Sequence, residues 1–279
     1  MSNSFIYSFD IHLMSDKDAN VPVAGYQVHA SFLDLVGQID PSLSARLHNE
    51  PGYRPYTLSP LSGGKIVGER VILRRGQPCR LRITLLDGGI LWDALQTYFC
   101  TAGPIVMHLG EINFRLIEMI VTPRSNPLCL VGSSDWQTLL TIPAQSTITM
   151  HFCTATAFSL GSHEYYLFPE PSLLFGGLLR VWNKYAPEQM RKEKQIIREL
   201  TLGKHISVNA CRLRHAYWHF PSYVQKGFVG QCTYQLRADQ LLASHFTTLA
   251  ALAYYAGAGY KTTMGMGQIR VKFGDMPYG

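Results

Sequence analysis

Strand-like and helix-like segments follow one another in the same order twice along the 279 residues. Strand-like segments are rich in β-branched and aromatic residues, whereas helix-like segments repeat apolar residues at every third or fourth position. In the first half these patterns predict a strand, a helix, two extended segments, a second helix and two closing strands, over residues 4–14, 22–38, 54–61, 78–86, 90–100, 105–107 and 113–122. Asp40-Pro41 follows the first helix and is predicted to break it.

The second half repeats this order, with Asp239 as the expected N-cap of its last helix. Its predicted strand, helix, two strands, helix and closing strand cover residues 146–156, 171–185, 206–220, 228–237, 239–255 and 268–273. Residues 123–134, with two prolines and a glycine, are the predicted linker. Two β-α-β-β-α-β orders predict an α+β protein with two tandem ferredoxin-like domains, at residues 1–125 and 135–279. RNA-recognition modules share this plan, although a fold alone does not give a function.

Composition excludes several classes of protein. Hydrophobic residues make up 47% and charged residues 16%, which a disordered chain would not show. The uncharged stretch 241–260 is about as long as a membrane span, but its polar residues and glycines predict a buried helix that ends in a loop. The N-terminus lacks the basic region of a signal peptide and carries Asp10, so we expect a cytoplasmic protein.

The six cysteines do not form a metal-binding or disulfide pattern. They lie at positions 79, 100, 129, 153, 211 and 232, so none is within the short spacing of a CxxC pair. Their neighbours are mostly apolar, which predicts buried free thiols in a reducing compartment.

The positive charge is concentrated in two stretches. Residues 46–82 contain eight Arg or Lys against two Glu, and residues 179–226 contain ten against three. The whole chain has a formal net charge of +6, so the remainder is acidic overall. Two basic stretches on such a background predict a polyanionic partner, although solvated basic faces would give the same pattern.

A glycine-rich loop at residues 257–267 (GAGYKTTMGMG) follows an apolar helix and precedes a strand. Backbone N–H groups in such a loop can approach a phosphate closely, and its lysine adds positive charge. The loop is not a Walker A motif, which has another spacing and lies between a strand and a helix, nor the dinucleotide fingerprint, which opens a helix. A flexible connector is the alternative interpretation.

Three segments together resemble one known family. Residues 256–271 (AGAGYKTTMGMGQIRV) look like the C-terminal glycine-rich motif of the repeat-associated RAMP superfamily. Residues 48–61 (HNEPGYRPYTLSPL) and 154–185, with their Pro-x-Pro and Trp-Asn elements, are similar to motifs of the CRISPR-associated endoribonucleases that process pre-crRNA. The resemblance spans both halves, and the family's two ferredoxin-like domains agree with the predicted order.

The resemblance implies cleavage of CRISPR repeat RNA without a metal. In that reaction the 2′-hydroxyl of the substrate attacks the adjacent phosphate, giving 2′,3′-cyclic phosphate and 5′-hydroxyl ends. It needs a base, an acid and cations around the phosphate, and histidine suits the first two roles. The resemblance places the catalytic histidine at His48, in a polar loop beside Arg46. His29 and Tyr26 on the first helix are candidate partners; Arg46, Arg54 or Lys65 could neutralise the phosphate.

A second set of residues is predicted to hold the RNA. Arg212 and Arg214 alternate on one face of a predicted strand, with Tyr217 and Trp218 beyond them. Alternating arginines can contact a phosphate backbone, and aromatic rings can stack on bases. The full predicted RNA-binding set is Arg191, Lys192, Lys194, Lys204, His205, Arg212, Arg214, Gly257, Gly259, Lys261, Thr262, Gly265 and Gly267.

Two other functions stay open at this stage. The chain could be a non-catalytic RAMP-type RNA-binding subunit of a CRISPR effector complex, or a two-domain protein whose glycine loop binds a small phosphate ligand. For the nuclease we expect no metal and no other cofactor, because no carboxylate cluster accompanies the histidines. The expected partners are CRISPR repeat RNA, possible effector-complex subunits and a possible second copy of the chain, with no membrane.

Overall fold

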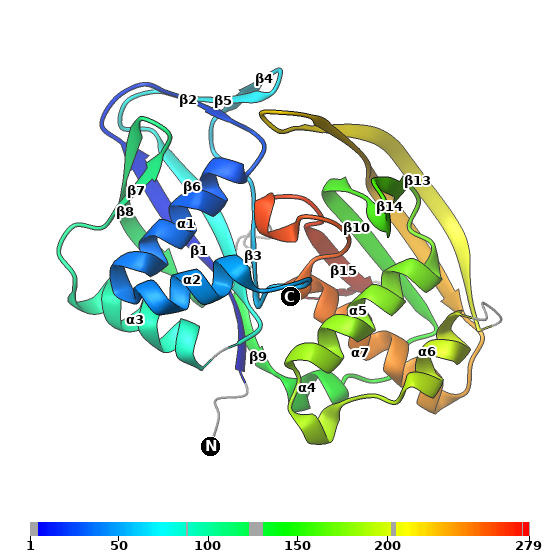
Figure 1. The fold of residues 1–279 in the computed structure, drawn as a ribbon. Helices are drawn as coiled ribbons and strands as arrows, with labels where there is room; N and C mark the ends of the chain where they lie inside the picture. Colours follow the sequence, from blue (N-terminus) through cyan, green and yellow to red (C-terminus); the bar gives the residue numbers. More distant parts are fainter. Residues whose placement is uncertain (1–4, 88, 123–130, 202–204, 275, 279) are drawn as a thin grey trace. The chain divides into compact units, whose positions relative to one another are not determined.

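The computed structural model describes residues 5–87, 89–122, 131–201, 205–274 and 276–278 (Figure 1). The chain divides into two compact units. The first contains Met1–Ser133, His219–Tyr223 and Thr263–Gly265; the second contains Ser134–Trp218, Val224–Thr262 and Met266–Gly279. Most of the predicted linker lies outside the described residues, and its last three residues belong to strand β9 (Gly132–Asp135), which pairs with β1. The domain boundaries at residues 125 and 135 stay a prediction.

The first unit is built on an antiparallel sheet with the spatial order β3-β6-β1-β8-β7. Its strands are β1 (Phe5–Ser15), β3 (Tyr56–Leu58), β6 (Pro78–Leu85), β7 (Val106–Leu109) and β8 (Ile112–Ile120). The helices are α1 (Tyr26–Ile39), α2 (Pro41–Asn49) and α3 (Ile90–Thr101). Without the insertions, the order β1-α1-β3-β6-α3-β8 and the pairing of β1 with both β6 and β8 define a ferredoxin-like unit.

Side chains alternate between the two faces of the sheet, and one face packs against the helices to form the hydrophobic core. Phe9, Ile11 and Leu13 point from β1 to one face and are buried with apolar residues of α1, α2 and β6. On the opposite face of the sheet, two arginines of the first basic stretch make contacts inside the unit. Arg82 donates from Nε to Ser8 at 2.9 Å, and Arg80 lies 3.4 Å from the buried Asp10 carboxylate. Burial raises the pKa of Asp10, although Arg80 and Arg82 oppose that shift.

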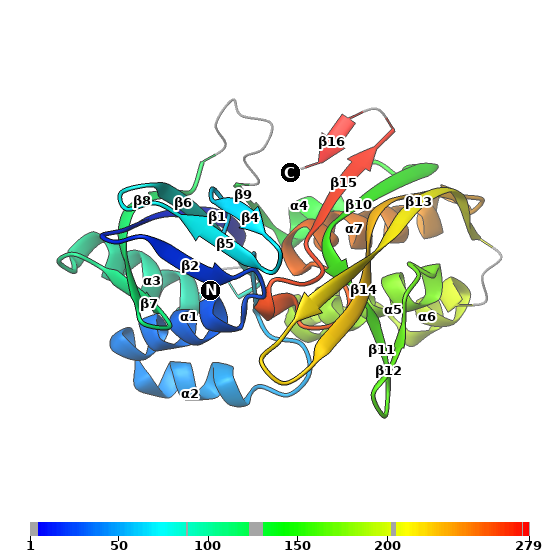
Figure 2. The same cartoon turned by 90° about the horizontal axis from the view of Figure 1, so that it is seen from above.

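The second unit repeats the plan with the sheet order β13-β14-β10-β15-β16. Its strands are β10 (Thr147–Thr156), β13 (Ile206–His219), β14 (Val224–Leu236), β15 (Ile269–Phe273) and β16 (Met276–Tyr278). The helices are α4 (Trp136–Leu140), α5 (Pro171–Tyr185), α6 (Lys194–Thr201) and α7 (Gln240–Ala256). The order β10-α5-β13-β14-α7-β15 is again ferredoxin-like, so the predicted fold of two tandem ferredoxin-like domains is confirmed. Figure 2 shows β13 and β14 as a long hairpin.

Several elements were not predicted, because they are short insertions into the two units. A three-stranded sheet joins β2 (Ala19–Pro22), β5 (Arg70–Leu73) and β4 (Lys65–Val67). A small hairpin joins β11 (Phe158–Gly161) and β12 (Glu164–Tyr166), and single helical turns form at η1 (Glu188–Met190) and η2 (Thr262–Met264). Segments of three or four residues are too short for a clear periodic pattern.

The long apolar helix and the cysteines can now be placed. Asp239 caps α7 by accepting a hydrogen bond from Leu242 N at 2.8 Å, as predicted, and α7 is largely buried. In the described part of the chain, no helix has both the length and the apolar character that crossing a membrane requires. The expectation of buried cysteines is wrong for three of them: Cys79 and Cys232 are buried, but Cys100, Cys153 and Cys211 are exposed free thiols. Cys129 lies outside the described residues.

Candidate functional site

His48 lies in the last turn of α2, not in the loop that the sequence predicted. Asp40 ends α1 but also starts α2, since its Oδ1 accepts hydrogen bonds from Ser42 N at 2.8 Å and Leu43 N at 3.1 Å. Leu43 and Leu47, four residues apart, bury one face of α2. His48 is exposed on the helix, and the structure gives its ring no hydrogen-bond partner among the described residues.

Arg54 fixes the end of this helix. Its Nε donates to the carbonyl of Leu47 at 3.0 Å, and its Nη2 donates to the carbonyl of His48 at 2.9 Å. A cation at a helix C-terminus stabilises the unpaired carbonyls and the helix dipole. Arg54, a candidate for neutralising the phosphate, therefore holds the backbone that carries His48.

Arg46 lies on the same helix as His48. It is exposed on α2 two positions before His48. Residues two apart in an α-helix point in nearly opposite directions around its axis. Arg46 therefore does not share a face with His48, and its part in catalysis stays a prediction.

His29 and Tyr26 occupy different environments on α1. His29 is 7% exposed; its Nδ1 lies 3.4 Å from the hydroxyl of Tyr56, and the two rings stack 6.1 Å apart. Burial raises the pKa of the Tyr56 phenol well above its usual range. Tyr26 begins α1 and is half-buried. His29 therefore packs in the interior while His48 faces solvent, and the catalytic roles of both stay predictions.

The glycine-rich loop is tightly folded; most of it belongs to the second unit, and Thr263–Gly265 is grouped with the first. Its four glycines all have positive φ, and Ala258 N donates to the carbonyl of Gly267 at 2.9 Å. Gly267 N donates to Ala155 O at 3.1 Å and Tyr260 N to Ala157 O at 2.8 Å, so the loop is bonded to the end of β10. A Cβ on Gly259 would lie 2.4 Å from the carbonyl oxygen of Ala157. The loop is thus a close-packed turn rather than a flexible connector.

Lys261 stands at the half-exposed rim of this loop. It is the loop's one non-glycine residue with positive φ, 53°, among those described. Its Nζ lies 5.4 Å from the centre of the Tyr260 ring, and Tyr260 contacts Tyr165 with ring centres 5.2 Å apart. Burial lowers the pKa of Lys261, opposed by Tyr165. Thr262, beside it, is also half-exposed and begins η2.

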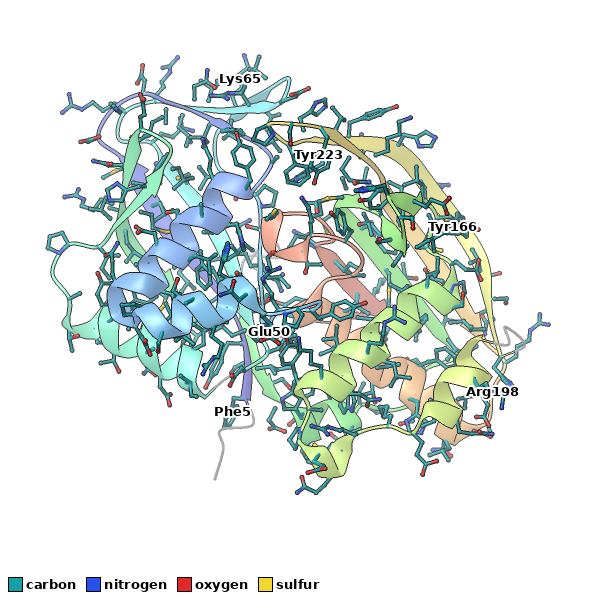
Figure 3. The ribbon with its side chains drawn as sticks, in the orientation of Figure 1. Phe5, Glu50, Lys65, Tyr166, Arg198 and Tyr223 are labelled. Carbon is teal, nitrogen blue, oxygen red and sulfur yellow. The ribbon has the colours of Figure 1, made fainter. Side chains whose placement is uncertain are left out.

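The β13–β14 hairpin presents the predicted arginines to solvent. Arg212 and Arg214 are both exposed and, two residues apart on β13, share one face of the strand. Arg191 is exposed, whereas His205 is half-buried, with Nδ1 3.4 Å from the carbonyl of Arg237. Figure 3 labels two further exposed side chains, Arg198 on α6 and Tyr223. Lys204 and the side chain of Lys194 lie outside the described residues.

Lys192 is a correction to the predicted RNA-binding surface, because its side chain is 8% exposed. Its Nζ lies 2.8 Å from Nδ1 of His245 and 5.0 Å from the centre of the Trp182 ring. Burial lowers the pKa of Lys192 to about 8, and burial with the Lys192 charge lowers the pKa of His245, opposed by Asp239. Burial and the short distance between the two nitrogens thus disfavour the charged forms of both side chains.

The Trp-Asn pair of α5 explains why Lys192 turns inward. Trp182 Nε1 donates to the carbonyl of Met190 at 2.7 Å. Asn183 accepts from Lys192 N at 2.8 Å and donates to its carbonyl at 2.9 Å. These bonds fasten the segment between α5 and α6 to the end of α5. Sequence patterns gave no signal for them, because side-chain to backbone bonds over eight or nine residues follow no periodicity.

The Lys192→Met substitution is expected to change how the free energy of unfolding depends on pH. The pKa of Lys192 is about 8 in the folded protein and about 10.4 in an unfolded chain. Between these two pH values the unfolded chain binds more protons than the folded protein. The free energy of unfolding of the wild type therefore rises with pH in this window, by at most ~1.4 kcal/mol per pH unit. Below pH 8 the contribution of Lys192 to this free energy does not change with pH. Urea unfolding should show a stability advantage of the variant at neutral pH that shrinks toward alkaline pH. The exposed Lys184→Met is the control, and a Lys192→Met difference independent of pH would contradict the buried-amine assignment.

The described residues contain no group of three or more His, Cys, Asp or Glu side chains that could hold a metal ion. The candidate residues therefore fall into two groups, each described by itself: His48 on α2 with its support from Arg54, and the glycine-rich loop with the arginine-bearing hairpin β13–β14.

Comparisons with known proteins agree with the tandem ferredoxin-like class that the fold defines. The model for the CRISPR Cas6 N-terminal domain matches residues 7–139, and the model for CRISPR-associated endoribonuclease Cas6 matches residues 150–269. The chain belongs to the Cas6 family.

Individual relatives support the same assignment. The CRISPR-associated endoribonuclease Cas6 of Mycobacterium tuberculosis is 29% identical over 47% of this chain and 40% of that protein, and the Cas6 of Streptococcus thermophilus is 27% identical over 46% of this chain and 51% of that protein. The matched part thus spans about half or less of these curated relatives. A product complex of Thermus thermophilus Cas6 has a TM-score of 0.78 and 27% identity, covering 96% of this chain and 99% of that one.

Proposed function

We propose that this chain is a metal-independent endoribonuclease that cleaves CRISPR repeat RNA, leaving 2′,3′-cyclic phosphate and 5′-hydroxyl ends. The observation that carries the proposal is the position of His48 in a chain of the Cas6 family: an exposed imidazole on the last turn of a helix whose end Arg54 fixes. An imidazole held this way can approach RNA without losing an internal partner.

The chemistry assigns a proton-transfer role to His48. The 2′-hydroxyl loses a proton as its oxygen bonds to phosphorus, and the bond from phosphorus to the 5′-oxygen breaks as that oxygen gains a proton. His48 serves one of these two transfers. Tyr26, half-buried at the start of α1, is the candidate for the other, because the described packing of His29 against Tyr56 keeps that imidazole from solvent.

The second unit supplies the features for holding RNA. Arg212, Arg214 and Arg191 offer exposed guanidinium groups for phosphates, and the glycine-rich loop offers Lys261 at its rim. The close packing of the loop means that its backbone shape is set before RNA binds, which lowers the entropic cost of binding. CRISPR repeat RNA is therefore the proposed partner; further effector subunits and a second copy of the chain stay predictions.

The direct test is incubation of the purified chain with CRISPR repeat RNA in EDTA, beside an RNA of the same composition in shuffled order. We expect cleavage at one position in the repeat and none in the shuffled RNA. Tight binding of the repeat without cleavage would favour the non-catalytic RNA-binding subunit. The absence of salt-dependent RNA binding would favour a small phosphate ligand.

Replacing Arg212 and Arg214 together with alanine is expected to weaken RNA binding and its salt dependence. Two lost phosphate contacts should reduce the slope of log K against log salt by about 1.4 for single-stranded RNA. Affinity measured at several salt concentrations gives this slope. The exposed Arg115→Ala on β8 is the control for a general change in charge. An unchanged slope in the double variant would mean that this face of the hairpin is only solvated.

A further inference from the structure

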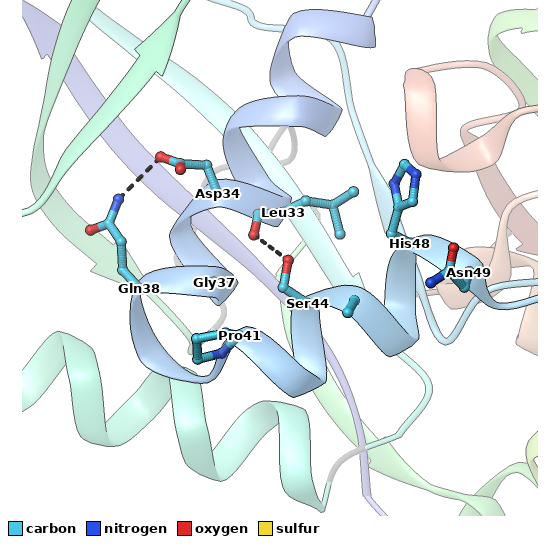
Figure 4. A pocket seen from close by; sticks show the side chains of 9 residues that line it. Leu33, Asp34, Gly37, Gln38, Pro41, Ser44, His48 and Asn49 are labelled. Atoms are coloured by element: carbon cyan, nitrogen blue, oxygen red, sulfur yellow. Dashed lines mark hydrogen bonds between the residues drawn. The ribbon is translucent and has the colours of Figure 1, made fainter.

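A groove lies between α1 and α2 in the first unit, and His48 is one of the residues that line it. It has a volume of about 600 Å³. Figure 4 shows Asp34 and Gln38 at one end and His48 and Asn49 at the other. Its lining is Leu33, Asp34, Gly37, Gln38, Pro41, Ser44, Ala45, His48 and Asn49.

We propose that this groove binds one unpaired nucleobase of the RNA substrate, a base that carries an exocyclic amino group, close to the bond that is cleaved. The inference rests on the proposed function, because it places the base beside the catalytic His48. It goes beyond that function by assigning a base-reading subsite to the α1–α2 surface.

The charge and polarity of the lining favour a base over a phosphate. Asp34 is the one carboxylate in the lining, which contains no Arg or Lys. An anionic phosphate would be repelled there, whereas the apolar surface of Leu33, Pro41 and Ala45 suits the flat face of a base. The volume is also within the range of small-ligand sites, about 300–1,000 Å³.

Asp34 is held as a hydrogen-bond acceptor. The hydroxyl of Tyr98 donates to Gln38 Oε1 at 2.9 Å, and Gln38 Nε2 donates to Asp34 Oδ2 at 3.1 Å. This chain from α3 orients the carboxylate and leaves Oδ1 for a donor from outside. The exocyclic amino groups of adenine, cytosine and guanine are such donors, and uracil has none.

Gly37 is the second observation that points to a ligand. It lies inside α1, where glycine costs about 0.5–1 kcal/mol relative to alanine. A Cβ at this position would meet Ser44 Oγ at 3.6 Å, an ordinary contact, so packing between the helices does not require glycine. A side chain at position 37 would instead reduce the volume of the groove.

The test measures base preference around the cut. Each of the nucleotides flanking the cleavage position is changed in turn to A, C, G and U, and cleavage rates are compared for wild type and variants. Wild type should cleave about 5–10-fold more slowly when uracil occupies one of these positions, because one hydrogen bond is lost. Asp34→Ala should remove that difference, and Asp93→Ala, at an exposed acid on α3, should keep it.

A second variant protects the test from a folding defect. Ala45 is exposed on α2, so Ala45→Leu should fold normally while its side chain fills the groove. It should also abolish the preference. If wild type cleaves without any preference for amino-bearing bases, or if both variants keep the wild-type preference, the inference is wrong. If wild type does not cleave repeat RNA at all, the proposed function fails instead.

Discussion

Replacing His48 with alanine is expected to lower the rate of repeat RNA cleavage by about 10²–10⁴-fold, the range typical for losing a proton-transfer group. Affinity for the RNA should be unchanged, because the imidazole of His48 has no hydrogen-bond partner among the described residues, and its loss should leave the fold of the first unit intact. Single-turnover cleavage and a binding titration measure the two quantities separately.

The matched control is His108→Ala. His108 is exposed on β7, and its Nδ1 lies 2.8 Å from Asn113 Oδ1. The His108→Ala substitution therefore removes an exposed imidazole from the same unit. The control should cleave at the wild-type rate. Wild-type cleavage by His48→Ala would remove His48 from the mechanism and with it the observation that carries the proposed function.

Replacing Gly267 with valine should destabilise the protein strongly. Gly267 has φ +67°, and a Cβ there would lie 2.1 Å from the carbonyl oxygen of Ala258. Valine is disfavoured in the left-handed backbone conformation, and its Cβ would displace the carbonyl of Ala258. Together these effects should lower the free energy of unfolding by about 2–5 kcal/mol. Chemical unfolding in urea, followed by circular dichroism, should show this loss as a lower midpoint.

Gly103 provides the comparison for that substitution. It is exposed, has no positive φ, and a Cβ there would meet nothing within 4 Å. Gly103→Val should therefore stay within about 0.5 kcal/mol of wild type. If Gly267→Val proves as stable as Gly103→Val, the glycine-rich loop is not the tight turn described above.

The long elements of the fold could be predicted from sequence because their patterns are strong. The helix at 171–185 was predicted with the bounds of α5, and β1, β6, β10, β13 and α7 were placed within a few residues. The helix α2 was missed for a physical reason. Asp40-Pro41 predicts the end of α1, but proline at the first helical position also suits a helix start, and Asp40 serves as cap for the second helix.

The candidate site was less predictable, because burial and side-chain direction depend on tertiary contacts. The first basic stretch suggested an exposed surface, yet Arg82 is buried against Ser8 and Arg80 lies near Asp10. Lys192 resembles its exposed neighbour Arg191 in sequence, yet Trp182 and Asn183 turn its segment inward. The direction of Arg212 and Arg214 was easier to predict, because residues two apart on a strand point to the same face.

Analysis of the product ends tests whether the 2′-hydroxyl of the substrate attacks the phosphate. Repeat RNA is cleaved in EDTA, and the products are analysed by mass and end-specific labelling, beside an RNA with one 2′-deoxy nucleotide at the cut. Attack by the 2′-hydroxyl predicts 2′,3′-cyclic phosphate and 5′-hydroxyl ends from the first RNA and no cleavage of the second. Cleavage of the 2′-deoxy RNA, or a 5′-phosphate on the product, would contradict attack by the 2′-hydroxyl and the role given to His48.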